Sequence, residues 1–344
     1  MFRQPDSLYA GVLLCSAIIL AVVDGSLFWL RMPGDERLRN YRLSRRFVGW
    51  AYFSLAFTDV LWLLFLREEY ELDFTRILVL AVAAVQATMF SGALVTLVNS
   101  RFPLARGVRR HLLAVAAGTA SLFGCMLFFP QAFPVLFRLT AAAYCVQIAL
   151  FARTFVREYR VCRRKLDNFF SDGEMRRLRW VAVSFLMTAL IGLTAAAWLV
   201  SGLGMPYLFA FTVYMVFYTF FGMKYINYPA EFGRIAPVIA DDVPEPLAAG
   251  ENIRTALDEW IAAKGYVRPG LSLESLAREV GCNRSYLSRY VNSELGLNFK
   301  SWIRALRIAE SQRLLLEHPG ASALEVGEMV GIHGRSTFFA QSPK

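Results

Sequence analysis

The first 226 residues of this 344-residue chain are dominated by seven apolar blocks. Each block has about 20 residues or more, which is the length that a helix needs to cross the hydrocarbon core of a bilayer. Gly and Ala recur inside the blocks, and such small residues let neighbouring helices approach closely in lipid. The sequence therefore predicts seven transmembrane helices, near residues 8–30, 47–66, 77–98, 111–130, 132–156, 180–203 and 206–226.

Basic residues gather in alternate loops between these blocks. The loops at 31–46, 99–110 and 157–179 contain eighteen Lys and Arg residues, whereas the opposite set (the N-terminus, 67–76, 131 and 204–205) contains three. Because loops rich in Lys and Arg stay in the cytoplasm, this pattern predicts an external N-terminus and a cytoplasmic C-terminus. The same pattern accounts for the net charge of +10, which is therefore not evidence for nucleic-acid binding. Residues 1–226 carry 24 basic and 13 acidic residues, whereas residues 227–344 carry 13 basic and 14 acidic residues.

Few ionisable residues lie inside the apolar blocks, and a charge in lipid is costly enough that each is a candidate functional residue. They are Asp24, Asp59 and Arg138. In the predicted orientation, Asp59 and Arg138 both lie toward the outer half of the membrane, where an ion pair between them is geometrically feasible. A structural clamp or a water-exposed end is favoured over a ligand or proton site. Gln86 and Gln147 are predicted to form hydrogen bonds between helices.

The blocks lack the motifs of hydrolytic or metal-dependent catalysis, such as His-Glu-x-x-His and Gly-x-Ser-x-Gly. The five cysteines show neither a Cys-x-x-Cys pair nor Cys/His metal spacing, and three of them lie in apolar blocks. The sequence therefore predicts no catalytic residue, no metal site and no cofactor.

Residues 227–250 differ in composition from both of their neighbours. They contain four prolines, Gly250 and the acidic pair Asp241-Asp242. This composition predicts a linker between a transmembrane domain, residues 1–226, and a soluble tail, residues 251–344. As a coil, 24 residues would span on the order of 25–30 Å, which would keep the tail close beneath the membrane.

The tail opens with an amphipathic helix and then shows a two-helix unit at about 272–294. In this unit a short helix begins at Ser272 and ends at Gly281, a residue that tolerates positive φ. Asn283 can cap the next helix, which has an exposed polar face. Two short helices around a Gly-containing turn are the pattern of a helix-turn-helix.

A long amphipathic helix, from about Asn298 to Glu317, joins this unit to a second one at about 323–341. The side chains of this helix that are predicted to face inward are those of Trp302, Ile303, Leu306, Ala309 and Leu314. The second unit repeats the pattern around a turn at Gly331, with an apolar stripe of Leu324, Val326, Met329 and Val330.

Residues 271–341 resemble the DNA-binding domain of AraC-type (AraC/XylS) transcriptional regulators. The resemblance implies that the second helix of each unit enters the major groove of promoter DNA, and that the long helix sets their separation. The matching residues are Leu273-Glu274-Ser275-Leu276-Ala277, Gly281, Tyr286-Leu287-Ser288-Arg289, Gly296, Phe299, Trp302, Leu306-Arg307-Ile308, Leu314-Leu315, Val330-Gly331 and Phe338. By motif position, the base-facing candidates are Ser285, Ser288, Arg289 and Asn292 in the first unit and Arg335, Ser336 and Thr337 in the second.

Two features depart from that family. The chain reads Ala340-Gln341-Ser342-Pro343-Lys344 where the family usually continues with a basic residue, a core aromatic and a Gly-x-Pro ending. Pro343 would also end the last helix early. In addition, nine basic and seven acidic residues in 271–344 are a modest surplus for a DNA-binding domain. We therefore expect the first unit to dominate DNA recognition.

The sequence thus predicts an all-α chain: a seven-transmembrane-helix bundle followed by an all-α double helix-turn-helix domain. The favoured function is a one-component transcriptional regulator in the cytoplasmic membrane of a bacterium. Its predicted partners are double-stranded promoter DNA and the lipid bilayer, with RNA polymerase and a second copy of the chain as further candidates. An alternative is a multi-pass transporter or membrane enzyme whose tail regulates or assembles it. In a third hypothesis, residues 1–226 only anchor an otherwise ordinary regulator.

The loop charges predict a testable topology. A reporter that is active only in the cytoplasm should work when it is fused after residue 40, 105, 168 or 240, and should fail after residue 70 or 204. Activity of the fusion at residue 70 would contradict the arrangement of seven spans.

Overall fold

The computed structural model describes residues 7–30, 38–65, 72–99, 104–172, 174, 176–201, 207–239, 253–318 and 320–332. The described part of the chain is helical, as predicted, and its extended pairing is limited to one isolated bridge, between Phe170 and Ser272. The chain divides into two compact units. The first contains residues 1–160 and 177–240, and the second contains residues 161–176 and 241–344.

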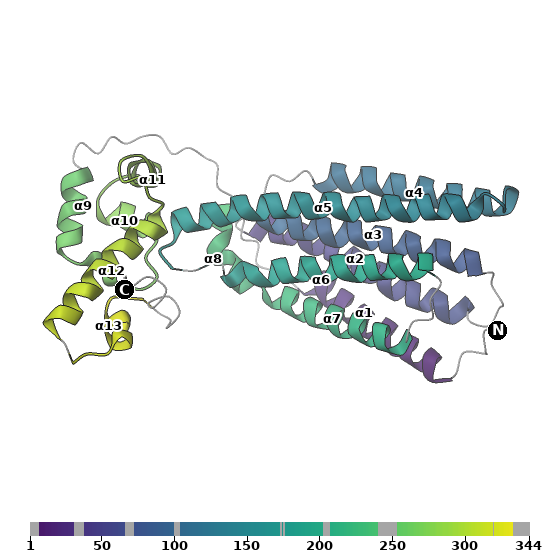
Figure 1. The fold of residues 1–344 in the computed structure, drawn as a ribbon. Coiled ribbons are helices and arrows are strands. Elements are labelled where there is room, and N and C mark those ends of the chain that lie inside the picture. The colour runs from purple at the N-terminus through teal and green to yellow at the C-terminus, as the bar shows by residue number, and fades with distance from the viewer. Residues whose placement is uncertain are drawn as a thin grey trace. The chain divides into compact units, whose positions relative to one another are not determined.

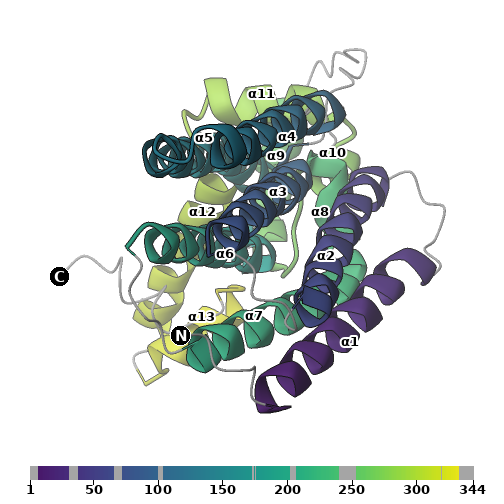
Figure 2. The same ribbon diagram turned by 90° about the vertical axis from the view of Figure 1, so that its right-hand side faces the viewer.

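The first unit is a bundle of long helices that run alongside one another (Figures 1 and 2). α1 packs against α2 and α7, and α3 packs against both α2 and α4. A buried apolar cluster joins side chains of α3, α4, α5 and α6. The helices are α1 (Ser7–Trp29), α2 (Arg39–Phe65), α3 (Leu72–Val98), α4 (Leu104–Phe128), α5 (Phe133–Phe169), α6 (Arg176–Ser201) and α7 (Tyr207–Asn227).

Four of the described helices are long and apolar enough to cross a membrane. They are the segments Asp73–Val98, Gly107–Phe128, Phe133–Phe169 and Arg176–Ser201, and a shorter apolar stretch covers Gly11–Leu27. The outer faces also carry large exposed apolar side chains, including Val135, Leu139 and Val146 on α5. Such a surface suits contact with lipid tails. The helices α1–α7 overlap the seven predicted blocks, and seven as the number of membrane crossings stays a prediction.

Two glutamines link helices inside the bundle, as predicted. On α3, Gln86 donates from Nε2 to the Ala51 carbonyl oxygen of α2 at 3.1 Å and to the Ser54 hydroxyl at 2.5 Å. On α5, Gln147 donates to Thr88 Oγ1 of α3 at 2.8 Å. Buried amides that bond across helices fix the rotation of one helix against another, because an unbonded amide would be costly there.

The three charged candidates lie in different surroundings. Asp59 is buried on α2 and accepts a hydrogen bond from Ser16 of α1, whose hydroxyl also lies 2.8 Å from the Met215 sulfur of α7. Asp24 is half-buried on α1. Arg138 is exposed on α5, and the structure shows no ion pair between it and Asp59, both of which are described. In place of the ion pair that the sequence left feasible, Asp59 has a hydrogen bond from Ser16, which holds α1 against α2.

The predicted linker is partly helical. α8 (Pro229–Ile239) occupies the first half of residues 227–250, and residues 240–250 lie outside the described part of the chain. Pro229 is its first residue, a position where the missing amide hydrogen costs nothing. Phe232 and Ile235 are fully buried, and the Phe232 ring lies 6.0 Å from that of Tyr41. The prediction of a coil rested on the proline content and overlooked the helical spacing of apolar residues such as Phe232 and Ile235.

The predicted loop at 157–179 is also mostly helical. α5 continues without a break to Phe169, well beyond the apolar block that ends at residue 156. Residues such as Arg, Lys and Leu are good helix formers, so a basic composition does not end a helix. The last part of α5, from Val161 onward, belongs to the second unit.

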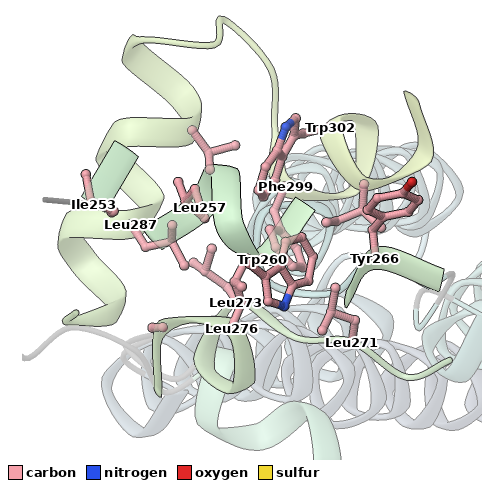
Figure 3. Close-up of a cluster of buried hydrophobic side chains, with 13 residues drawn as sticks. Ile253, Leu257, Trp260, Tyr266, Leu271, Leu273, Leu276, Leu287, Phe299 and Trp302 are labelled. Carbon is pink, nitrogen blue, oxygen red and sulfur yellow. The ribbon is translucent and has the colours of Figure 1, made fainter. Parts of the chain in front are cut away.

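The second compact unit has an apolar core to which each helix from α9 to α12 contributes (Figure 3). The helices are α9 (Ile253–Ala262), α10 (Leu273–Glu279), α11 (Arg284–Ser293), α12 (Phe299–Glu317) and α13 (Ala323–Met329). The rings of Trp260 and Trp302 lie 6.1 Å apart within this core. Burial of one such large side chain contributes about 1.5–3 kcal/mol. Ile253, Leu257 and Trp260 on one face of α9 are buried here.

Charge reversals test the surroundings of Asp59. Asp59→Lys should sharply lower the yield of monodisperse detergent-solubilised protein, because it buries a cation beside Ser16. Asp59→Asn keeps an acceptor for Ser16 and should leave the yield nearly unchanged. Arg138→Glu, on an exposed face, should also be tolerated. Size-exclusion chromatography measures each yield, and recovery in the Asp59→Lys/Arg138→Glu double variant would restore the ion-pair interpretation.

Candidate nucleic-acid interface

The first helix-turn-helix unit is built from its caps. Ser272 caps α10 by accepting from the Ser275 amide, and the Ser275 hydroxyl bonds back to the Ser272 amide at 3.0 Å. Gly281 adopts φ +64, a left-handed conformation that favours glycine, and turns the chain. Asn283 then caps α11 by accepting from the Tyr286 amide at 3.0 Å. Each cap and the turn lie where the sequence predicted them.

α11 presents one apolar and one polar face. Leu287 and Val291 are buried in the core of the second compact unit, and Tyr286 packs against that core. Arg289 and Asn292 are exposed on the other side of the helix. The guanidinium of an exposed arginine can offer two parallel donors to guanine in the major groove.

Two serines share that side of the helix. Ser285 and Ser288 are half-buried. The Asn292 side-chain amide donates to the Ser288 carbonyl at 2.8 Å and contacts its hydroxyl at 3.3 Å. Arg289 is thus the exposed cation among the first unit's four candidates, and its side chain projects from a helix that the core holds in place.

α12 separates the two units and carries the residues that the sequence interpretation missed. Asn298 caps it, and Trp302 and Ile303 are buried, as predicted. Ala309, predicted to face inward, is exposed, whereas Arg307 and Glu310 are buried. Arg307 follows Ile303 by four residues, so it lies on the buried stripe of the helix. That spacing could have identified it, but a charged residue is normally assigned to a solvent-exposed face.

Glu310 binds two cations where α12 meets the segment after α9. Lys264 donates to its carboxylate at 2.8 Å, and Arg313 donates to it at 2.7 Å. The hydrogen bonds from Arg313 and Lys264 lower the pKa of Glu310 to about 2. Because this pKa lies below its value in an unfolded chain, the contribution of Glu310 to stability is present above about pH 4.5 and is lost as the pH falls toward 2.

The second helix-turn-helix unit repeats the construction of the first helix-turn-helix unit as far as residue 332. Ser322 and Glu325 form a reciprocal cap of α13, and Val326 and Val330 are buried. Gly331 adopts φ +77, which confirms the predicted turn. Leu324 and Met329, predicted to belong to the buried stripe, are exposed among the described residues. The candidates Arg335, Ser336 and Thr337 lie outside the described part of the chain.

Comparison with known proteins finds a match in this part of the chain. Residues 276–342 match the sequence model of a family described as a helix-turn-helix domain. The C-terminal part of the chain is thus similar to helix-turn-helix domains of the AraC type. No curated protein and no solved structure matches the chain. The family match begins at Leu276 and therefore excludes residues 1–275, for which the comparisons identify no relative.

The exposed face of α11 carries side chains that are suited to binding. The described residues contain no group of three or more His, Cys, Asp or Glu side chains arranged to hold a metal ion. The described face of α11 instead offers hydroxyl, amide and guanidinium groups, which can bond to base edges and phosphates.

The two turn glycines provide a matched pair of variants. Gly281→Ala should destabilise the domain by about 1–2 kcal/mol, because alanine disfavours a positive φ but meets no atom within 4 Å. Gly331→Ala should cost more, because the new methyl group would also lie 2.5 Å from the Val267 carbonyl oxygen. The rate of tryptic cleavage of the tail in the intact protein measures both losses, since about 1.4 kcal/mol is a tenfold change in the open fraction. Gly320→Ala, which meets nothing within 4 Å, is the control. Equal rates for the Gly281 and Gly331 variants would contradict this geometry.

Proposed function

We propose that this protein is a membrane-embedded, one-component transcriptional regulator that binds specific promoter DNA through its C-terminal AraC-type domain. The observation that carries the proposal is the first helix-turn-helix unit, where a capped and core-anchored α11 exposes Arg289 and Asn292. The match of residues 276–342 to a helix-turn-helix family supports the same interpretation.

The helical bundle of the first compact unit is proposed to place this domain at the inner face of the cytoplasmic membrane of a bacterium. Four described helices have the length and composition of membrane spans. The concentration of Lys and Arg in alternate loops supports a cytoplasmic C-terminus. Residues 1–226 would then serve as a sensor or an anchor, and the bilayer, RNA polymerase and a second copy of the chain remain proposed partners.

A transporter or membrane enzyme with a regulatory tail is the alternative. A carrier would need polar groups in its bundle that are available to a substrate, whereas three polar side chains of the described helices bond to neighbouring helices: Asp59 is bonded to Ser16, and Gln86 and Gln147 are bonded to α2 and α3. These residues hold helices together, which favours a regulator over a carrier.

DNA selection by the intact protein tests the proposal. The full chain in lipid nanodiscs should retain a small set of fragments from a pool of sheared genomic DNA, and sequencing of the bound fragments should reveal a common motif. Empty nanodiscs are the control for lipid-bound DNA. Retention of fragments without any shared motif would contradict sequence-specific binding.

Arg289 should account for part of this specificity. Arg289→Ala in the intact protein should weaken binding to the selected site by about 1–3 kcal/mol and relax the preference at one base pair. Arg254→Ala, an exposed arginine on α9 outside both helix-turn-helix units, is the matched control and should bind as the wild type does. Titrations use one fixed salt concentration, because phosphate contacts make affinity depend on salt. Equal losses for the two variants would show that Arg289 does not read a base.

A further inference from the structure

The end of α5 belongs to the same folded unit as the helix-turn-helix tail. Residues 161–176 and 241–344 form one compact unit. α5 is a single uninterrupted helix from Phe133 to Phe169, so this one helix begins in the first compact unit and ends in the second compact unit. Residues 161–172, named here the coupling segment, therefore connect to the tail by a route separate from the chain between residues 240 and 252.

Backbone hydrogen bonds join the coupling segment to the start of the first helix-turn-helix unit. Phe170 and Ser272 form an antiparallel bridge. The Ser171 amide and hydroxyl both donate to the Leu271 carbonyl, at 3.0 and 2.8 Å. Because Ser272 is the cap of α10, these bonds hold the coupling segment directly against the beginning of that helix.

Charged side chains extend this contact to α11 and α12. Lys300, in the first turn of α12, donates to Asp167 at 2.7 Å. The guanidinium of Arg284, the first residue of α11, lies 5.6 Å from the centre of the Phe169 ring, within the range of a cation–π contact. The coupling segment thus touches the starts of α10, α11 and α12.

Asp172 provides the most informative contact, because it neutralises a buried cation. Its Oδ1 accepts from Arg307 Nη1 at 2.9 Å, and its Oδ2 accepts from the Gly270 amide at 2.6 Å. The Arg307 side chain is only 5% exposed, whereas that of Asp172 is 32% exposed. A buried guanidinium that loses its carboxylate is strongly destabilising.

Arg307 also joins the two helix-turn-helix units to each other. Its guanidinium donates to the Gly331 carbonyl, in the turn of the second unit, at 3.0 Å. It further donates to the carbonyl oxygens of Tyr266 and Arg268, ahead of the first unit, at 2.8 and 2.7 Å. One side chain therefore ties the turn of the second unit to the segment that leads into the first, and Asp172 from α5 holds that side chain.

We propose that the coupling segment is a regulatory part of the DNA-binding domain. Through the contact between Asp172 and Arg307, α5 sets the position of the two helix-turn-helix units relative to each other. The docked arrangement is the DNA-binding form, because Arg289 and Asn292 are exposed while the segment is docked. This inference rests on the proposed function.

The first arm of the test removes the charge of Asp172. Asp172→Asn in the full chain in nanodiscs keeps the shape of the side chain and an acceptor for Gly270. It should weaken binding to the selected site about tenfold, the scale of one lost hydrogen bond between charged groups. Binding to a random-sequence duplex, which depends on phosphate contacts, should stay unchanged. Asp258→Asn, at an exposed position of α9, is the matched control and should bind as the wild type does.

The second arm locks the coupling segment in place. Residues 170 and 272 pair directly in an antiparallel bridge, a spacing compatible with a disulfide. The Phe170→Cys/Ser272→Cys variant should therefore form a disulfide on oxidation, and the Phe170→Cys single variant should not. In the Asp172→Asn background, oxidation of this pair should restore the lost affinity, and reduction should remove it again.

Three results would overturn the inference: wild-type affinity for Asp172→Asn, no disulfide between positions 170 and 272, or loss of DNA binding on oxidation. The last result would mean that docking inhibits DNA binding. Disulfide formation is measured without DNA, on non-reducing gels. If the disulfide forms but the wild type selects no DNA, the proposed function fails while docking stands.

Discussion

The arrangement of the tail depends on the hydrogen bonds of the buried Arg307 guanidinium. This guanidinium forms four hydrogen bonds, to Asp172 and to the carbonyl oxygens of Tyr266, Arg268 and Gly331. A guanidinium has five N–H donors in a planar fork, so one side chain can satisfy several backbone carbonyls that lie in different directions. Burial of this charge is tolerated only because a carboxylate and three carbonyls surround it.

Apolar packing and caps provide the rest of the framework around Arg307. Trp260 and Trp302 anchor α9 and α12 in one core, while Ser272 and Asn283 fix where α10 and α11 begin. α11 is short, and helices of its length are marginal in isolation. Its position therefore comes from Leu287 and Val291 in the core, and this anchoring is what leaves the opposite face exposed to a partner.

Much of this fold could be predicted from sequence because its signals are local. Capping residues such as Ser272 and Asn283, and a positive-φ glycine such as Gly281, act within a few residues of the chain, so each gave the correct boundary. The glutamines Gln86 and Gln147 were also predicted correctly, since a buried amide in an apolar helix has few alternatives to an interhelical bond.

The long-range contacts were missed, because sequence spacing does not encode them. Asp172 and Arg307 are 135 residues apart, and no local pattern in either segment indicates that they pair. Charge and predicted depth alone left an ion pair between Asp59 and Arg138 feasible, whereas the structure gives Asp59 a neutral partner, Ser16. The helical end of α5 and α8 were assigned to loops because basic residues and prolines resemble loop composition even where the helix continues.

The central claim is that the AraC-type domain binds specific DNA while the chain remains in the membrane. Genome-wide mapping of DNA cross-linked in living cells to the intact protein, recovered from the membrane fraction, tests this claim most directly. The account predicts a few sharp peaks that share one motif and that are lost in the Arg289→Ala variant. A uniform distribution, or peaks that Arg289→Ala leaves unchanged, would contradict it.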